Sequence, residues 1–152
     1  DVWIIQMALA ESVAARLRKH GFKCKTVEIT VRDNGLYSFS RQIHLRQPTN
    51  ITNEIVTAAF QLFKDNYKWE HPIRSLGIRA ADLVLDDIPV QLDLFGNQEK
   101  KEKLEKLDRT VDEIRRRFGY FSIQRAAMYQ DKVLSHLDAG THTVHPYSYF
   151  HG

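Results

Sequence analysis

The feature that most constrains the fold is the tripeptide Asp33-Asn34-Gly35, which separates two runs of alternating apolar and polar residues. Asn and Gly accept the left-handed backbone of a tight turn, so the tripeptide favours a β-hairpin between residues 26–32 and 38–46. Arg41 interrupts the apolar phase of the second run, which indicates either a β-bulge or a strand that extends beyond the core. Two neighbouring antiparallel strands are therefore predicted.

Apolar residues at helical spacing flank this hairpin on both sides. Residues 1–20 predict an amphipathic helix that ends at Gly21, and residues 49–53 offer capping side chains for a second helix that runs to about Asn66. Residues 72–79 return to alternation and predict a third strand. The apolar stripe expected on the first helix consists of Val2, Ile5, Leu9, Val13 and Leu17.

The order helix, strand, strand, helix, strand predicts an α+β fold, a two-layer sandwich in which both helices cover one face of an antiparallel or mixed sheet. The other face is left to solvent or to a partner. It carries short hydroxyl side chains, a glycine and arginines, with Glu28 as its only acidic residue. Such a face suits the close approach of a phosphate backbone, although an ordinary solvated face is the alternative. The residues predicted to point outward are Thr26, Thr30, Arg32, Ser38, Ser40, Gln42, His44, Arg46, Ser75, Gly77 and Arg79.

The charge is distributed unevenly along the 152 residues. Residues 1–85 contain twelve Lys and Arg against eight Asp and Glu, a net charge of +4. A mildly basic domain is compatible with binding to nucleic acid, and a free-standing sheet-based RNA-binding module is one alternative to a DNA-binding domain. Outward hydroxyls and arginines favour contacts with the phosphate backbone over the base stacking that aromatic residues of such an RNA module would make.

The motifs of several enzyme classes are missing. The sequence has no Gly-rich phosphate loop, nucleophile elbow, metalloprotease helix or paired zinc cysteines, so we predict that this chain alone is not a catalyst. The acidic pairs Asp86-Asp87 and Asp112-Glu113 are expected on a tether and on a solvated helix, without a pocket that would place them on a metal. Residues 139–152 contain histidines without ligand spacing, and we predict a flexible His- and aromatic-rich terminus rather than a metal site.

Other features bear on the origin of the chain. The single Cys24 excludes an internal disulfide, and no apolar run approaches the length of a membrane span, so a reducing cytoplasm is the expected compartment. Asp1 leads directly into a helical pattern, which suggests a fragment of a longer protein.

Residues 86–97 are predicted to form a tether rather than part of the core. They contain Gln91-Leu92-Asp93-Leu94-Phe95 between Pro89 and Gly96-Asn97, which favours an extended and exposed segment. A side-chain amide followed by apolar anchors can dock into a small groove of a partner. The spacing also allows a second interpretation, in which Leu92 and Leu94 are the inward residues of another strand.

Residues 98–138 are predicted to form a charged helical hairpin. Its first helix spans residues 98–118 and has a narrow apolar seam, so a protein-interaction adaptor is a third interpretation of the chain. Gly119 breaks this helix, and a second helix is expected from Ser122 to Leu137. Arg115-Arg116-Arg117 is interpreted as a solvated face or a complement to the helix dipole. The seam consists of Leu104, Leu107, Val111, Ile114 and Phe118.

Taken in order, these segments resemble the little-finger domain of Y-family translesion DNA polymerases, of the UmuC/ImpB/MucB type found in Gram-positive bacteria. The resemblance covers nearly the whole chain. Gln91-Leu92-Asp93-Leu94-Phe95 is similar to the pentapeptide by which such polymerases bind the bacterial β sliding clamp. The segments that carry the resemblance are Leu17–Gly21, Thr26–Ile29, Tyr37–Arg41, Pro48–Asn50 and Pro72–Arg79, followed by Ile114–Gly119 and Ser122–Ala126 of the tail.

The resemblance implies that residues 1–85, without the family's first strand, lay the open sheet along primer-template DNA. It adds Arg41 and Arg74 to the predicted outward residues as DNA contacts, beside Ser40, Ser75 and Arg79. The predicted DNA-binding set is therefore Thr26, Thr30, Arg32, Ser38, Ser40, Arg41, Gln42, His44, Arg74, Ser75 and Arg79.

The resemblance also implies partners and a parent activity. Leu94 and Phe95 would enter the pocket of the clamp, and the amide of Gln91 would bond at its rim. The helical tail is expected to contact an accessory subunit. The palm that holds two magnesium ions for nucleotidyl transfer is absent from this chain, so no cofactor is expected here. The parent would be an error-prone lesion-bypass polymerase of the SOS response to DNA damage.

Overall fold

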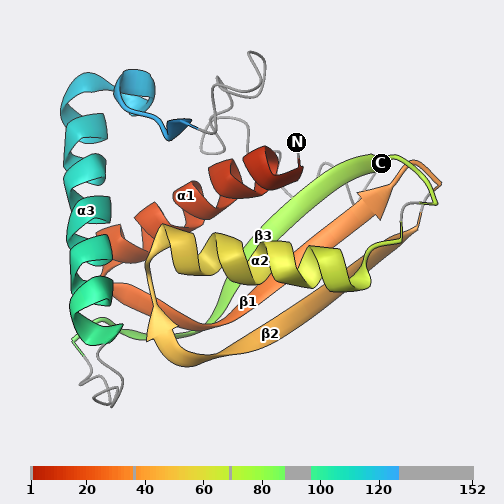
Figure 1. The fold of residues 1–152 in the computed structure, drawn as a ribbon, viewed down its shortest axis with the longest axis horizontal. Coiled ribbons are helices and arrows are strands. Elements are labelled where there is room, and N and C mark those ends of the chain that lie inside the picture. Colours follow the sequence, from red (N-terminus) through yellow and green to blue (C-terminus); the bar gives the residue numbers. More distant parts are fainter. Residues whose placement is uncertain (1, 36, 69, 88–96, 127–152) are drawn as a thin grey trace.

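The structure is a computed structural model that describes residues 2–35, 37–68, 70–87 and 97–126 (Figure 1). Its first five elements follow the predicted order of helix, strand, strand, helix and strand, and a long helix comes after them. The elements are α1 (Val2–His20), β1 (Phe22–Asp33), β2 (Ser38–Thr49), α2 (Thr52–Asn66), β3 (Ile73–Leu85), α3 (Asn97–Phe118) and the short 3₁₀ helix η1 (Tyr120–Ser122).

The three strands form one antiparallel sheet in the order β2-β1-β3, and α1 and α2 both lie on one of its faces (Figure 1). This arrangement confirms the predicted α+β two-layer sandwich. The central strand β1 supplies Val27, Ile29 and Val31 to the core, where they form one buried cluster with Ile55 and Phe63 of α2. Burial of each such side chain contributes about 1.5–3 kcal/mol, so this cluster is the main source of stability.

The buried surface of α1 differs from its predicted apolar stripe. Leu17 is buried as predicted, but Ile5 and Leu9 are only half-buried, whereas Ala8 and Ala14 are fully buried. The physical reason is that α1 contacts α2, the sheet and α3 at once, so small residues on several sides face a neighbouring element. Periodicity of large apolar residues does not reveal such contacts.

The strand β2 is irregular at its end, although not at the predicted place. It runs through Pro48 to Thr49, and its pairing with β1 skips residues 45–48. Proline has no N–H to donate to a strand ladder, which accounts for a bulge there. Around Arg41 the register is continuous over residues 38–44, so the interpretation of Arg41 as a bulge is wrong. Arg41 is instead exposed on an edge strand, where it pairs with Ile29.

The helix α3 crosses one end of the sandwich, next to the C-terminal end of α1 and the start of α2 (Figure 1). The contact includes a buried ionic cluster. Arg18 of α1 donates to Asp112 at 2.6 Å and to Asp108 at 3.1 Å, and its side chain is only 4% exposed. Asp108 also accepts the backbone N–H of Thr52, the first residue of α2, at 2.9 Å. α3 is therefore joined to both helices of the sandwich.

A second buried carboxylate holds the chain that follows α3. Glu11 of α1 accepts hydrogen bonds from Arg115 at 2.8 Å, from Arg125 at 3.0 Å and from the hydroxyl of Tyr120 at 3.2 Å. Arg115 also stacks on the ring of Tyr120, with its guanidinium carbon 4.5 Å from the ring centroid. These contacts fold residues 119–126 back toward α1.

The predicted second helix of the tail does not begin at Ser122. Ser122 ends η1, and Ile123 has an extended backbone with φ −143° and ψ 132°. Residues 127–152, which include the rest of the predicted hairpin and the His-rich terminus, lie outside the described residues, as does the pentapeptide Gln91–Phe95. Both interpretations of that peptide therefore stay predictions.

The described residues contain neither a membrane span nor a metal cluster. None of their helices is long and apolar enough to cross a membrane. Over the same residues, no three His, Cys, Asp or Glu side chains come together in a way that could hold a metal ion.

Candidate nucleic-acid interface

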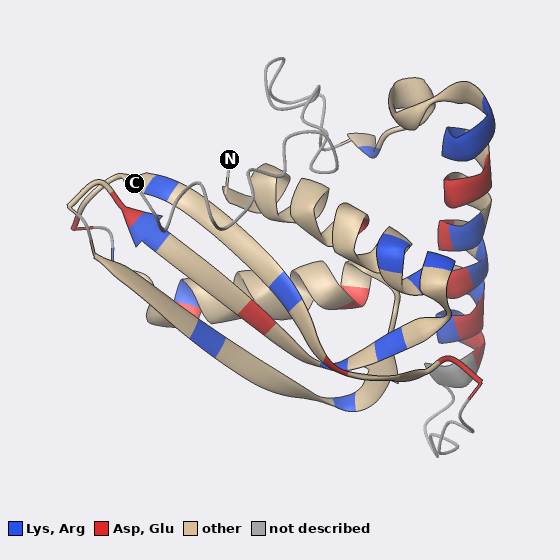
Figure 2. Ribbon diagram, turned by 180° about the vertical axis from the view of Figure 1, so that it is seen from behind, with Lys and Arg blue, Asp and Glu red and all other residues tan. Residues whose placement is uncertain are grey.

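The sheet face turned away from α1 and α2 is not covered by either helix (Figure 2). Its composition follows from the strand register, because residues that pair across antiparallel strands point to the same face. Four rows cross the sheet from β2 through β1 to β3, and they contain every residue predicted to point outward except Arg46. The rows are His44–Thr26–Ala81, Gln42–Glu28–Arg79, Ser40–Thr30–Gly77 and Ser38–Arg32–Ser75.

The centre of this open face is formed by short side chains. Thr30 lies between Ser40, whose hydroxyl is 3.4 Å from its own, and Gly77, which has no side chain. Arg32 and Arg79 occupy the two neighbouring rows. A phosphate group could therefore approach the backbone at the centre while guanidinium groups reach it from both sides, an arrangement that favours backbone contacts without base readout.

One end of the open face is closed by a hydrogen-bonded group. Thr26 is only 1% exposed, and its hydroxyl donates to the carboxylate of Asp82 at 2.5 Å. His44 places Nδ1 at 2.9 Å from the same hydroxyl oxygen. Because the hydroxyl has a single proton and a carboxylate only accepts, Nδ1 of His44 is the donor in this arrangement. The Thr26 hydroxyl is thus buried and already hydrogen-bonded to Asp82 and His44, which argues against the predicted direct contact with DNA.

Asp82 is a residue of this face that the alternation pattern did not predict. Its backbone has φ +53°, the only positive value among the described non-glycine residues, so Asp82 does not follow the strand alternation. The open face consequently carries a second acidic residue, whereas Glu28 was the only one predicted. Alternation predicts side-chain direction only where the backbone is regularly extended, and no sequence signal marks this departure.

Two of the predicted DNA contacts lie outside the four rows. Arg41 pairs with Ile29 and so belongs to the side that the helices cover, where its guanidinium carbon lies 5.2 Å from the centroid of the Phe39 ring. Arg74 is exposed at the register shift between β1 and β3 and has no paired residue in the ladder. Arg46 lies in the part of β2 that the pairing skips. The four rows therefore contain fewer arginines than predicted, because Arg41, Arg46 and Arg74 are not among their residues.

The fold and the open polar face together define a little-finger type of domain, the class that the resemblance predicts. The chain belongs to the impB/mucB/samB family, because the model of this family's C-terminal domain matches residues 2–94. The predicted relation to the C-terminal part of Y-family polymerases is confirmed.

The chain is similar to proteins named DNA polymerase IV. It is 42% identical over 137 residues to that of Acetivibrio thermocellus, which covers 90% of this chain and 34% of the relative. It is 32% identical over 126 residues to that of Pelotomaculum thermopropionicum, 83% of this chain and 30% of the relative. The protein of Bacillus subtilis named DNA polymerase IV 2 is 34% identical over 130 residues, 84% of this chain and 30% of its own length. The chain thus spans about a third of the length of these relatives.

Proposed function

We propose that residues 1–85 bind the backbone of primer-template DNA through the open sheet face. The observation that carries this proposal is the row arrangement, in which short hydroxyls and Gly77 lie between Arg32 and Arg79. Such a surface supports binding that is weak, independent of sequence and sensitive to salt. An RNA-binding module that stacks bases is less well supported, because the four rows contain no Phe, Tyr or Trp and their single aromatic ring, that of His44, is hydrogen-bonded to Thr26.

Fluorescence anisotropy with a labelled primer-template tests the sheet proposal. The double variant Arg32→Ser, Arg79→Ser should bind about tenfold or more weakly, since a charge-assisted hydrogen bond contributes about 1.5–3 kcal/mol. Its salt dependence should also fall, by about one unit of slope for each phosphate that is no longer neutralised. The control is Lys64→Ser, Lys68→Ser, which removes the same charge at exposed positions of α2 and the turn after it. Equal affinities for the two double variants would refute the assignment.

We further propose that Gln91-Leu92-Asp93-Leu94-Phe95 binds the β sliding clamp. Support comes from the order of its side chains and from its place at the C-terminal end of the segment that matches this family's domain. Binding would tether a weak DNA grip to a clamp that encircles DNA and so raise the local concentration of DNA. Capture on an immobilised clamp should be lost in Leu94→Ala, Phe95→Ala and retained in Arg32→Ser, Arg79→Ser. Retention by the first variant would return the peptide to the strand interpretation.

We propose that the parent protein is a lesion-bypass DNA polymerase of the SOS response in the cytoplasm. The relatives are named DNA polymerase IV, which supports the polymerase part of this proposal. The described residues do not fit the two magnesium ions of nucleotidyl transfer, because they contain no suitable group of acidic ligands. We propose that the portion of the parent protein outside this chain holds those ions. A primer-extension assay across an abasic site with the full-length gene product tests this proposal, and inability to pass any lesion would refute it.

A second binding role is favoured by the seam of α3. Leu107 is 55% exposed and Phe118 is 74% exposed, so the seam offers apolar surface to a partner at both positions. We propose that this seam contacts an apolar helix of an accessory subunit. Cross-linking in cells through a photoreactive residue at position 107 should give a discrete adduct that Phe118→Gln removes. Failure to form an adduct would refute this role of the seam.

A further inference from the structure

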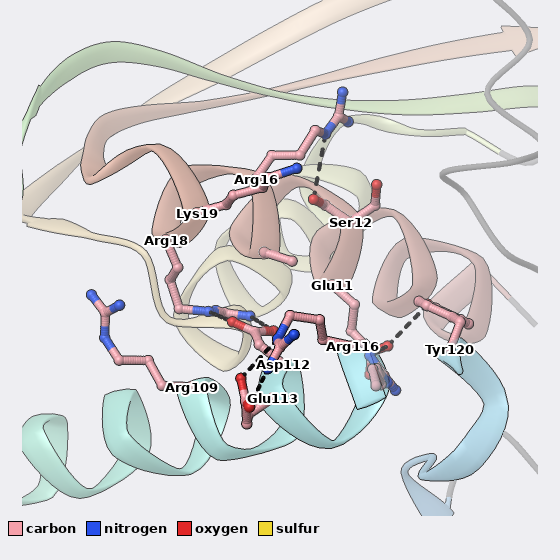
Figure 3. Close-up of a pocket in the computed structure, with 12 residues that line it drawn as sticks. Glu11, Ser12, Arg16, Arg18, Lys19, Arg109, Asp112, Glu113, Arg116 and Tyr120 are labelled. Carbon is pink, nitrogen blue, oxygen red and sulfur yellow. Dashed lines mark hydrogen bonds and ion pairs between the residues drawn. The ribbon is translucent and has the colours of Figure 1, made fainter. Parts of the chain in front are cut away.

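A groove of about 690 Å³ is lined by α1, α3 and Tyr120, and none of its lining residues belongs to the sheet (Figure 3). Its α1 side carries Ser12, Arg16 and Lys19, and its α3 side carries Arg109 and Arg116. The groove exists because the buried ion pairs of Arg18 hold α3 against α1. It is therefore a feature of the docked tail and not of the sandwich alone.

The groove has an excess of positive charge. Six Lys and Arg side chains line it against three Asp and Glu, and all three carboxylates are already engaged in ion pairs with lining arginines. The pairs are Glu11–Arg115 at 2.8 Å, Asp112–Arg18 at 2.6 Å and Glu113–Arg116 at 2.6 Å. The excess thus amounts to three cations, namely Arg16, Lys19 and Arg109.

Two of these three cations have no acidic partner within the described part of the chain. Arg109 pairs with Glu105 at 3.1 Å and with Asp86 at 3.5 Å, both outside the lining. Arg16 and Lys19 are exposed, and no ion pair joins either of them to a described carboxylate. Arg16 donates only a long hydrogen bond, 3.4 Å, to the carbonyl of Ser12. An anion that enters the groove would therefore meet cations whose charge is not already compensated.

We propose that this groove binds the phosphate backbone of a nucleic-acid strand and forms a second DNA contact beside the sheet. The uncharged lining side chains are Ser12, Ala15 and Tyr120, and the Tyr120 ring is covered by Arg115. A phosphate backbone needs only cations and hydrogen-bond donors, which the groove supplies, whereas a protein partner usually binds through a buried aromatic or apolar anchor. The uncompensated cations Arg16 and Lys19 both lie on α1, and the guanidinium group of Arg16 can donate two parallel hydrogen bonds to one phosphate.

The inference extends the proposed DNA-binding function to another surface, and one set of variants separates the two. Arg16→Glu, Lys19→Glu alters exposed residues that form no structural ion pair, so the fold should be retained, as circular dichroism would verify. Affinity for a primer-template with a long single-stranded template should fall about tenfold, and the salt slope should fall by about two units. If Arg16→Glu, Lys19→Glu binds DNA like wild type while Arg32→Ser, Arg79→Ser binds more weakly, the groove proposal is overturned and the sheet proposal stands. If only Arg16→Glu, Lys19→Glu loses affinity for DNA, the proposal that the sheet binds DNA is refuted instead.

A direct measurement uses the chemistry of the single cysteine. Cys24 is fully buried, so Ser12→Cys introduces the one accessible thiol of the described residues and can carry an aryl-azide cross-linker. Photolysis should attach the probe to DNA, and the matched probe at the exposed position Thr57 of α2 should not react. Equal yields at both positions would overturn the proposal. A poly-glutamate peptide that binds wild type but not Arg16→Glu, Lys19→Glu, without DNA cross-linking at position 12, would identify an acidic peptide as the ligand instead.

Discussion

Asp108 in the middle of α3 accepts the backbone N–H of Thr52 at 2.9 Å, and so caps a helix that begins 56 residues earlier in the chain. The residue before Thr52 is Ile51, whose side chain cannot cap, and α2 has no side-chain cap of its own. Thr49, among the predicted capping residues, instead bonds to the N–H of Ile51 and to Glu54. α3 thus supplies a helix cap for α2 that the residues of the sandwich itself do not supply.

Removal of this cap should destabilise the protein markedly. Asp108→Ala deletes a helix cap and leaves the buried guanidinium of Arg18 with one carboxylate instead of two, which together should lower the free energy of unfolding by about 2–4 kcal/mol. Urea unfolding measures the loss. The control is Glu113→Ala, which should change the free energy of unfolding little, because Glu113 pairs only with exposed arginines. Similar losses for both variants would mean that Asp108 is not structurally important.

Glu11 should control the position of the segment after α3. Glu11→Gln removes the charge that Arg115 and Arg125 neutralise, although its side chain keeps nearly the same size. Amide hydrogen exchange of residues 119–126 should become at least tenfold faster, while β1 should remain protected. Glu54→Gln, which weakens the Lys101 pair at the other end of α3, should leave exchange of residues 119–126 unchanged. Uniform acceleration throughout the chain would indicate global destabilisation instead.

The positive φ of Asp82 predicts an order of tolerance at that position. Asn accepts a left-handed backbone and keeps an acceptor for the Thr26 hydroxyl, so Asp82→Asn should be nearly neutral. Asp82→Val places a β-branched residue in a forbidden region and should cost about 1–3 kcal/mol in a thermal melt. Asp87→Val in the neighbouring exposed turn serves as the control. A smaller loss for Asp82→Val than for Asp87→Val would show that the backbone is not left-handed at this position.

Glu113 should remain ionised to unusually low pH. Its pKa is lowered to about 2, first by the hydrogen bond from Arg116 and then by Arg117. A carboxyl pKa that is depressed in the folded state stabilises the protein above the ordinary pKa, and this contribution is lost as the pH falls from about 4.5 toward 2. NMR titration should show the Glu113 carboxyl as strongly acidic in wild type and closer to the ordinary value in Arg116→Gln, Arg117→Gln. Because Glu113 is exposed, added salt should weaken the shift.

Cys24 should be unreactive while the protein is folded. Burial raises the pKa of its thiol to about 11, so almost no thiolate exists at neutral pH. Alkylation by iodoacetamide at pH 8 should therefore follow unfolding, and Asp108→Ala should accelerate it. The thiol ionises near pH 9 in the unfolded chain but only near pH 11 in the folded protein. The free energy of unfolding should therefore fall as the pH rises from about 9 to 11. Rapid labelling of native wild type would contradict the buried position.

Much of the sandwich could be predicted from local sequence. The turn at Asp33-Asn34-Gly35 and the alternation around it specified the hairpin, since Asp33 accepts the N–H groups of Gly35 and Tyr37 within the turn itself. Gly21 ends α1 with φ +74°, as a glycine stop requires. These features depend on neighbours in sequence, which is why their residue types were sufficient evidence.

Contacts between residues that are distant in the sequence were decided only by the tertiary structure. Asp112 was expected on a solvated helix, yet it forms a partly buried ion pair with Arg18 across 94 positions of sequence. Charged residues carry no local signal for burial, because desolvation becomes favourable only when a partner is placed opposite them by the fold. The sequence by itself determined which elements form and which sheet face is polar. The docking of α3, and with it the basic groove, was decided by long-range ion pairs that no local pattern encodes.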